Sequence, residues 1–411
     1  MPILLPEDLA LKLPRMSRVR QIFSDERLAD ISGAVCEQMA RPEIRAVITP
    51  GAKVAVAVGS RGISNLSLIV RTVIGQLKEA GAEPFIVPAM GSHGRGTAEG
   101  QRDILASYGL DQETMGVPVI SSVEVARLGA LKNGCPVYFD QSALAADLVL
   151  PINRIKLHTD FVHDIQSGLC KMLVIGLGNH QGCSAMHENG FEHFGDLLIE
   201  AAEIIRRKVK VGFGLGIVEN AYDQTLMVEA IRGEELVVRE KELVKLARSR
   251  MPGLMIPEID VLVVEQIGKN ISGNGYDPNI LGRSFLLKEF VLPVPKIGRM
   301  VLTGLSAQTH GNASGIGSFD VITKEVFEQL DLEDTYANCL AVNSLDDAKI
   351  PLIAATEDEA VRVAVKSLPR ADKDKLRIVK IKNTLELESI EVSDALLEHV
   401  ASHPGLALMA D

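Results

Sequence analysis

The sequence contains no tryptophan, and aromatic residues make up only 4% of its 411 residues. Its five cysteines are widely spread and form no CxxC pair, so neither a disulfide framework nor a cysteine-rich zinc site is indicated. This cysteine usage favours a cytoplasmic protein with free thiols. We interpret Cys170 and Cys183 as small buried side chains.

Long runs of apolar or basic residues are also missing. No stretch has the roughly 20 apolar residues that cross a bilayer, and the N-terminal residues lack the apolar core of a secretory signal. The net charge is −11, and the longest basic run is RRKVKVG at residues 206–212. Because nucleic-acid binding requires concentrated lysine and arginine, we expect no nucleic-acid partner. Because no apolar stretch is long enough to cross a bilayer, we also expect no membrane partner.

The chain is longer than the size at which one hydrophobic core stops growing, so we expect two domains. Short apolar runs at residues 52–60, 83–90, 118–122 and 146–152 alternate with helical patterns, as in parallel strands joined by helices. The same texture resumes after a segment rich in proline and glycine at residues 249–257. We predict an α/β fold with mainly parallel sheets, an N-terminal domain at residues 1–252, a C-terminal domain at residues 253–411, and an interdomain cleft for a small ligand.

Two glycine-rich loops follow predicted strands, at whose carboxyl ends parallel α/β sheets bind ligands. VGSRGISN holds Arg61, which is either a carboxylate-binding residue or a surface arginine on a turn. MGSHGRGT holds His93 between glycines that let the backbone approach a ligand, which favours a functional over a structural histidine. Neither loop matches GxGxxG or GxxxxGK[ST], so neither a Rossmann dinucleotide site nor a P-loop is indicated.

A third segment concentrates histidines around a lysine. Five of the nine histidines lie between residues 158 and 193: His158, His163, His180, His187 and His193. Lys171 stands in the apolar run LCKMLVIG, a setting typical of a desolvated, nucleophilic amine. His193 precedes a predicted helix beginning at Phe194, and we interpret it as structural. Two imidazoles at separate strand ends, His93 and His158, suit proton transfer on both faces of a substrate.

These loops resemble the nickel-dependent lactate racemase family, including its 2-hydroxyacid racemase and epimerase relatives. The likeness extends from residue 53 to residue 193 and rests on SRG (60–62), GSHGRGTAEGQ (91–101), IKLH (155–158) and SGLCKMLVIG (167–176). It implies a cytoplasmic isomerase that inverts C2 of a small-molecule 2-hydroxy acid. The implied cofactor is a nickel-pincer nucleotide, pyridinium-3,5-bisthiocarboxylic acid mononucleotide with nickel, which is linked to a lysine and accepts hydride.

The resemblance also implies roles for individual residues. Lys171 would bear the cofactor, His93 and His158 would be the paired acid/base residues, and Arg61 would hold the substrate carboxylate. Ungapped alignment from Lys171 makes His187 the nickel ligand, and His180 takes that role if a gap intervenes. One imidazole beside soft sulfur and carbon donors is a reasonable ligand for Ni(II).

The sequence departs from the family pattern in several places. The acidic residue before Arg61 is missing, SGG becomes SGL, and the loop before the lysine motif is longer and inserts His163 and Asp164. The tyrosine and lysine that the family's second domain contributes have no clean match, and we name Lys269 and Tyr276 as substitutes. These departures favour a hydroxy acid different from, or larger than, lactate.

Other interpretations remain open. A lyase or isomerase could use His93 and His158 with a simple divalent metal or without one, and a non-catalytic relative could have lost the nickel cofactor. The loop THGNASGIGSFD either turns His310, Asn312 and Ser314 toward the cleft or is a plain connection. The sequence names neither the hydroxy acid nor the oligomeric state.

Overall fold

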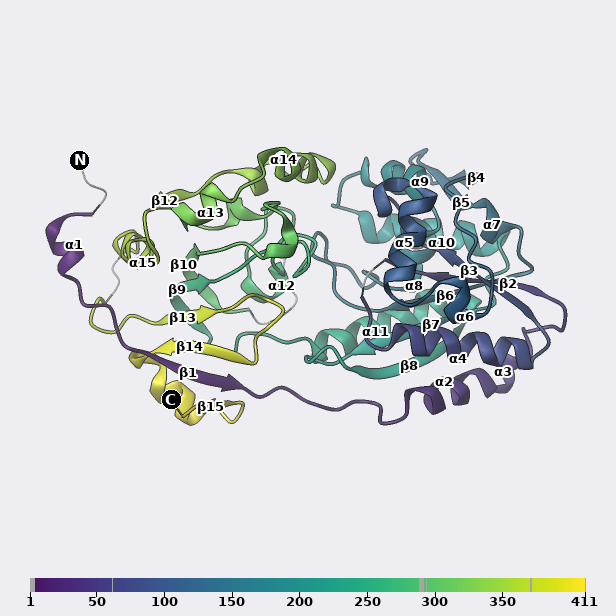
Figure 1. Ribbon diagram of the computed structural model, residues 1–411, viewed down its shortest axis with the longest axis horizontal. Coiled ribbons are helices and arrows are strands. Elements are labelled where there is room, and N and C mark those ends of the chain that lie inside the picture. The colour runs from purple at the N-terminus through teal and green to yellow at the C-terminus, as the bar shows by residue number, and fades with distance from the viewer. Residues whose placement is uncertain (1–3, 61, 288–291, 293, 370–371, 411) are drawn as a thin grey trace. The chain divides into compact units, whose positions relative to one another are not determined.

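The chain divides into two compact units in a computed structural model that describes residues 4–60, 62–287, 292, 294–369 and 372–410 (Figure 1). The central unit is Ser24–Met251, and the terminal unit combines Met1–Phe23 with Pro252–Asp411. The sequence predicts that residues 1–23 belong to the first domain, within residues 1–252. They lie instead in the terminal unit, because the strand Met16–Gln21 pairs with strands near the C-terminus.

The central unit is built on a five-stranded sheet in the order β3-β2-β6-β7-β8, and only β8 runs antiparallel to its neighbour. A separate hairpin, β4–β5, stands beside it. The strands of this unit are β2 (Lys53–Val58), β3 (Glu83–Pro88), β4 (Val125–Ala130), β5 (Pro136–Asp140), β6 (Leu148–Arg154), β7 (Phe213–Glu219) and β8 (Thr225–Arg232). Its helices are α2 (Ile31–Ala40), α3 (Pro42–Arg45), α4 (Leu66–Glu79), α5 (Ala98–Ser107), α6 (Gln112–Met115), α7 (Gln141–Leu144), α8 (Leu169–Lys171), α9 (Asn179–His187), α10 (Phe194–Lys208) and α11 (Leu236–Arg250).

Strand β7 explains how the two faces of this sheet are covered. Phe213, Leu215 and Ile217 point into a core that also contains buried side chains of α2 and α4. The alternate residues are glycines, and a Cβ built on Gly214 would lie 2.9 Å from Leu169 of α8 and 3.1 Å from Leu236 of α11. Because side chains alternate between the faces of a strand, these glycines let α8 and α11 pack closely on the second face.

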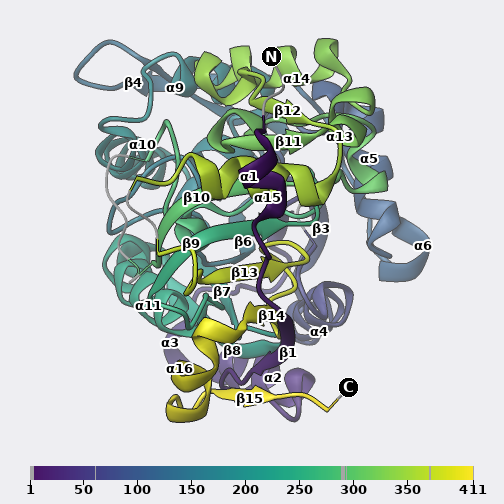
Figure 2. The same ribbon diagram turned by 90° about the vertical axis from the view of Figure 1, so that its left-hand side faces the viewer.

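The terminal unit contains an eight-stranded sheet in the order β12-β11-β10-β9-β13-β14-β1-β15. The five strands from β12 to β13 are parallel, and β14, β1 and β15 continue the sheet antiparallel. Figure 2 shows α1 lying against α15 on this unit. The elements are α1 (Pro6–Ala10), β1 (Met16–Gln21), β9 (Glu258–Val264), α12 (Pro278–Leu281), β10 (Lys296–Leu302), β11 (Val321–Thr323), α13 (Lys324–Glu328), α14 (Leu332–Ala341), β12 (Leu352–Ala354), α15 (Glu357–Lys366), β13 (Ile378–Ile381), β14 (Ser389–Ser393), α16 (Leu397–Ser402) and β15 (Leu406–Leu408).

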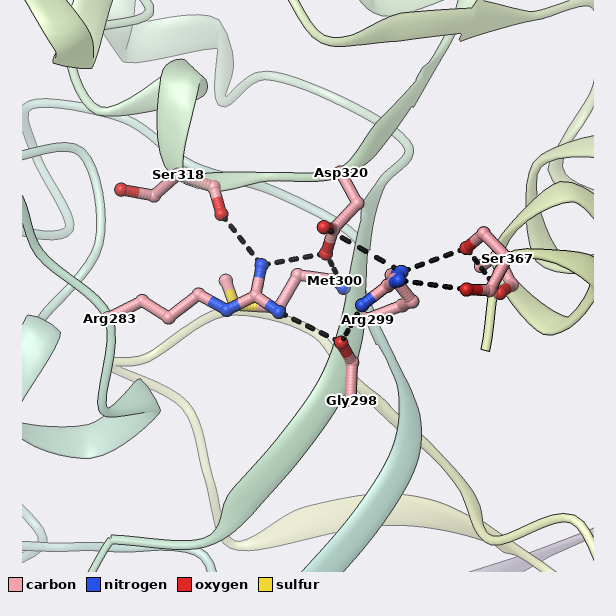
Figure 3. Close-up of polar contacts among 8 residues, drawn as sticks. Arg283, Gly298, Arg299, Met300, Ser318, Asp320 and Ser367 are labelled. Atoms are coloured by element: carbon pink, nitrogen blue, oxygen red, sulfur yellow. Dashed lines mark hydrogen bonds and ion pairs between the residues drawn. The ribbon is translucent and has the colours of Figure 1, made fainter. Parts of the chain in front are cut away.

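A polar network fastens β10 to its surroundings in the terminal unit (Figure 3). Asp320 accepts hydrogen bonds from the Arg283 guanidinium at 2.6 Å and from the Met300 backbone N–H at 2.7 Å. Arg299 reaches the other way and donates to the hydroxyl and the carbonyl oxygen of Ser367, both at 2.8 Å. The network joins the segment after α12 to β10 and the end of α15.

The predicted α/β class with mainly parallel sheets is confirmed by this architecture. The strand predicted at residues 118–122 is wrong, because only Val119 forms a bridge, to Ile86. Ser121 leaves the sheet edge there and donates to the Ala98 carbonyl at the start of α5. Across the described residues, no helix combines the length and apolarity that crossing a membrane requires.

Candidate functional site

Three loops leave the same edge of the central sheet. Val58 at the end of β2 is aligned with Pro88 at the end of β3 and with Ile152 near the end of β6. The strands are parallel, so the segments that follow them start side by side at the carboxyl edge, the usual ligand edge of such a sheet. These segments carry Ser60, His93 and His158.

Glycines bring the loop after β3 against the segment that follows Lys171. The Gly91 N–H donates to the Gly176 carbonyl at 3.0 Å. A Cβ on Gly91 would lie 3.1 Å from the Ile175 carbonyl oxygen, and one on Gly176 would lie 2.7 Å from the Ala89 carbonyl oxygen. Gly91 also has φ +59°, a conformation that favours glycine. The backbones therefore touch at a point that tolerates no side chain on either partner.

His93 is held from the loop after β2. Its Nδ1 hydrogen-bonds the Ser60 hydroxyl. The loop after β3, which carries His93, is also anchored by Gln101, whose buried amide donates to the Gly91 carbonyl at 3.1 Å. Thr97 caps α5 and accepts the Gly100 N–H at 3.1 Å. His93 thus belongs to a loop that is fixed at several points.

Lys171 and His158 are in direct contact, with the Lys171 amine hydrogen-bonded to His158 Nε2. The His158 ring is oriented by its own loop, since Nδ1 accepts the Asp160 N–H at 3.1 Å and the His158 N–H donates to the Gln166 side chain at 2.8 Å. Only 10% of the His158 side chain is exposed. The structure thus brings together two of the predicted site residues.

The backbone at Lys171 changes helix type. Lys171 ends the single turn α8, and the next residues, Met172–Gly176, form a π-helical turn closed by the Leu177 N–H on the Met172 carbonyl at 2.9 Å. Short π turns inside helices are frequent at functional sites. Here the wider turn lies against the loop that carries His93.

His187 lies one turn after Cys183 on α9. Its Nδ1 is 2.7 Å from the Cys183 carbonyl oxygen and 3.5 Å from the Cys183 sulfur. Burial lowers the pKa of His187, but the hydrogen bonds and charge of Cys183 outweigh it and leave that pKa raised. Burial likewise raises the pKa of Cys183, while His187 and Ser92 overcome it and leave the thiol pKa lowered.

An aromatic cluster joins the histidines. Phe161, Phe191 and Phe194 contact one another, with ring centroids 5.2 to 6.4 Å apart. The His158 ring lies 4.5 Å from Phe161, and the His187 ring lies 5.1 Å from Phe194. This cluster makes one side of the site apolar and packs both imidazoles in defined orientations.

Behind Lys171, Glu240 of α11 is completely buried and accepts the Cys170 N–H at 2.9 Å. Burial raises the pKa of Glu240 to about 7, against the lowering effect of hydrogen bonds from Cys170 and Leu169. Burial, and then the adjacent Glu240 carboxylate, hold the pKa of the Cys170 thiol well above its ordinary value. Cys170 is buried as predicted, whereas Cys183 is partly exposed, so its interpretation as a buried side chain is wrong.

The other histidines of the segment lie differently. His180 is exposed at the first turn of α9, where its ring stands beside Gly96. His163 lies 3.3 Å from Asp196 and covers Gly195. His193 is exposed directly before α10, which begins at Phe194 as predicted. Of the two predicted metal ligands, His187 lies 5.1 Å from Phe194 of the aromatic cluster, whereas His180 lies beside the loop that carries His93.

The remaining predicted residues lie elsewhere. Arg61 falls outside the described residues. In the terminal unit, the Lys269 amine donates to the Gly273 carbonyl at 2.7 Å. Tyr276 is fully buried, packs edge-on against Phe319, and donates its hydroxyl to the Arg283 carbonyl at 2.9 Å. His310 adopts φ +50°, and Asn312 and Ser314 are buried.

Sequence reasoning missed Glu240 and the phenylalanine cluster. A signal for Glu240 was present, because it shares a helical face with Leu236, Leu243 and Val244, all of which are buried. A carboxylate on a core-facing stripe is unusual unless it has partners. The phenylalanines carry no such signal, since single aromatic residues in loops are common.

The described residues contain no group of three or more histidine, cysteine or carboxylate side chains arranged to hold a metal ion. His187 on its own can supply a single imidazole. All five cysteines are free thiols.

Comparisons with known proteins show a match to one family model and similarity to solved structures. Residues 2–195 match the family model of the lactate racemase N-terminal domain. The lactate racemase apoprotein from Thermoanaerobacterium thermosaccharolyticum shares the fold with a TM-score of 0.54 and 13% identity, over 90% of this chain and 99% of that one. A Thermotoga maritima protein does so with a TM-score of 0.50 and 15% identity, over 84% and 92%. Among curated protein sequences, no match is found. The resemblance to the lactate racemase family is thus confirmed: residues 2–195 match the model of its N-terminal domain, and the fold is shared with a lactate racemase apoprotein.

Proposed function

We propose that the protein is an isomerase that inverts C2 of a 2-hydroxy acid, with Lys171 carrying a nickel-pincer nucleotide. The observation that carries the proposal is the contact between the Lys171 amine and His158 Nε2, with His187 packed into the same aromatic cluster. The sequence match and the shared fold support membership of the racemase family. The 2-hydroxy acid substrate and the nickel-pincer nucleotide are the parts that we propose.

The residues of the site fit that cofactor. The group brings its own sulfur and carbon donors and needs one imidazole, which agrees with a site that offers His187 but no protein cage among the described residues. The Nδ1 of His187 donates to the Cys183 carbonyl at 2.7 Å, so Nε2 is the nitrogen left to bind metal. A partly buried amine next to an imidazole suits covalent attachment at Lys171.

The two histidines supply the acid/base chemistry. When bound, the cofactor provides a hydride acceptor next to the substrate's C2. His93 and His158 come from different loops. One would take the hydroxyl proton from one enantiomer, and the other, in its protonated form, would give a proton to the oxygen as the opposite enantiomer forms. The Ser60 hydroxyl holds His93 through Nδ1, and the Asp160 N–H holds His158 through Nδ1.

The decisive experiment uses the full chain made in a host that synthesises the nickel-pincer nucleotide. We expect an added mass on Lys171 by peptide mapping, nickel by elemental analysis, and racemisation of one member of a panel of chiral 2-hydroxy acids by polarimetry. Lys171→Ala should lose the added mass and the nickel, while Lys132→Ala, an exposed control, should keep both. A wild-type chain without adduct or nickel would overturn the proposal.

Histidine variants separate the metal ligand from the acid/base pair. His187→Ala should lose nickel, whereas His180→Ala should retain it, because His180 is exposed and lies apart from the aromatic cluster. His93→Ala and His158→Ala should keep the adduct and slow turnover about 10²- to 10⁴-fold, the usual contribution of an acid/base residue. Nickel retained in His187→Ala and lost in His180→Ala would reverse the ligand assignment.

A further inference from the structure

Glu240 is a charged residue at a position that should be apolar. It lies in the middle of α11, is completely buried, and shares its helix face with buried leucine and valine side chains. Burying a carboxylate is costly unless hydrogen bonds compensate for the lost water. Its role must therefore come from the groups that it contacts.

Those groups are the residues immediately before Lys171. Glu240 Oε2 accepts the Cys170 N–H at 2.9 Å, and the neighbouring Leu169 N–H acts with it to lower the pKa of the carboxyl against the effect of burial. The first N–H groups of a helix have no partner within the helix, and a carboxylate is a favourable one. Gly168 is part of the same fit, since a Cβ there would lie 2.5 Å from Glu240 Oε1.

The residues after Lys171 are held from the opposite direction. The Gly176 carbonyl accepts the Gly91 N–H, and Gly176 approaches Ala89 too closely to allow a side chain. Lys171 is therefore carried by a segment that is fixed at one end by α11 and at the other by the loop that holds His93. The two anchors set the position of its Cα and the direction of its side chain.

We propose that Glu240 is a positioning residue that directs the Lys171 amine onto His158. It acts through the backbone of residues 168–170 and does not itself touch the amine. The inference rests on the proposed function only in the use that it assigns to Lys171. Small misplacements of a reactive group are costly to chemistry, so a buried anchor one residue away has a clear purpose.

A double-mutant cycle on the full chain, purified without cofactor, tests the proposal. The rate of Lys171 acetylation by acetic anhydride is measured by mass spectrometry relative to exposed Lys132, with and without His158→Ala. We expect His158→Ala to change the rate at least about threefold in the wild-type background, as for groups in direct contact. The change should vanish in Glu240→Ala and shrink in Glu240→Gln, which keeps one acceptor oxygen.

Glu242→Gln is the matched control, since Glu242 lies on the exposed side of the same helix and pairs with Lys245. It should preserve the full effect of His158→Ala. Circular dichroism identifies variants that fail to fold, and Glu240→Gln keeps the test available if Glu240→Ala does not fold. An undiminished effect of His158→Ala in both folded Glu240 variants would overturn the inference, as would no effect in the wild type. Labelling needs no adduct, so failure of the proposed function remains distinguishable.

Discussion

Two cysteines, 13 residues apart in the sequence, show how their surroundings set side-chain chemistry. Cys170 is completely buried beside the Glu240 carboxylate, and burial followed by that carboxylate raises its thiol pKa. Cys183 is partly exposed next to His187 and Ser92, and those hydrogen bonds overcome the effect of burial and lower its thiol pKa. The first thiol stays protonated and inert, whereas the second is the more readily ionised.

Glu240 should make stability depend on pH. Burial raises its pKa from 4.5 to about 7, and Oε1 has no hydrogen-bond partner among the described residues. Because the folded state binds this proton more tightly, the stabilisation is complete below pH 4.5 and is lost as the pH rises through about 7. The unfolding free energy of the wild type, taken relative to Glu240→Gln, should fall by about 3 kcal/mol between pH 4.5 and pH 8.

Urea unfolding of both proteins at several pH values measures this difference. The comparison with Glu240→Gln cancels the titration of histidines and surface carboxylates, which both proteins share. Parallel pH profiles for the two proteins would mean that Glu240 ionises in the folded state as freely as in the unfolded chain.

At the scale of elements, the site depends on glycines that permit backbone contact. Gly91 and Gly176 join the loop after β3 to the π turn after Lys171. Gly168 makes room for Glu240, and Gly214 admits Leu169 of α8 to the sheet. Each of these glycines lacks a side chain at a point where two elements meet. The segment carrying Lys171 can therefore fit between the sheet, α11 and the loop that carries His93.

Replacing Gly176 by alanine should destabilise the protein. The new Cβ would lie 2.7 Å from the Ala89 carbonyl oxygen and 3.0 Å from its carbon, and backbone atoms of a buried strand end cannot easily move. We expect a loss of about 1–3 kcal/mol, as for other overpacked positions. Gly75→Ala is the opposite control, because nothing lies within 4 Å and Gly75 is inside α4. Gly75→Ala should raise the free energy of unfolding by about 0.5–1 kcal/mol. Thermal denaturation of both variants and the wild type measures the two effects.

Local patterns in the sequence were sufficient for part of this arrangement. Strand periodicity predicted β2, β3 and β6, and it also predicted that His158 follows the end of a strand. Glu240 was missed because its partner, Cys170, is 70 residues away in the sequence. The single bridge at Val119 was overestimated as a strand, since β propensity alone does not reveal where a neighbouring strand ends.

At the scale of the whole molecule, the chain enters the terminal unit, leaves it at Phe23 and returns at Pro252. Sequence patterns did not predict this, because β1 pairs with β14 and β15 across most of the chain length. Gln21, at the end of β1, is the residue where the outgoing and returning segments meet. It is completely buried.

Gln21→Leu should therefore destabilise the terminal unit selectively. The Gln21 amide donates to the carbonyls of Leu387 at 2.7 Å and Gly253 at 3.2 Å, and its oxygen accepts the Met255 N–H at 2.8 Å. Leucine fills a similar volume but removes the partner of these three backbone groups. The contact with Leu387 is buried and those with Gly253 and Met255 are partly buried, so we expect a loss of at least about 1–3 kcal/mol, the cost of one unsatisfied buried group. Arg20→Leu is the neighbouring control, since the Arg20 side chain forms an exposed ion pair with Glu388. It should change stability by less than about 1 kcal/mol.

Hydrogen exchange should show β9 and β13 losing protection in Gln21→Leu while β2 and β6 keep theirs. Equal loss in both sheets would mean that the two units unfold together and that Gln21 stabilises the whole chain.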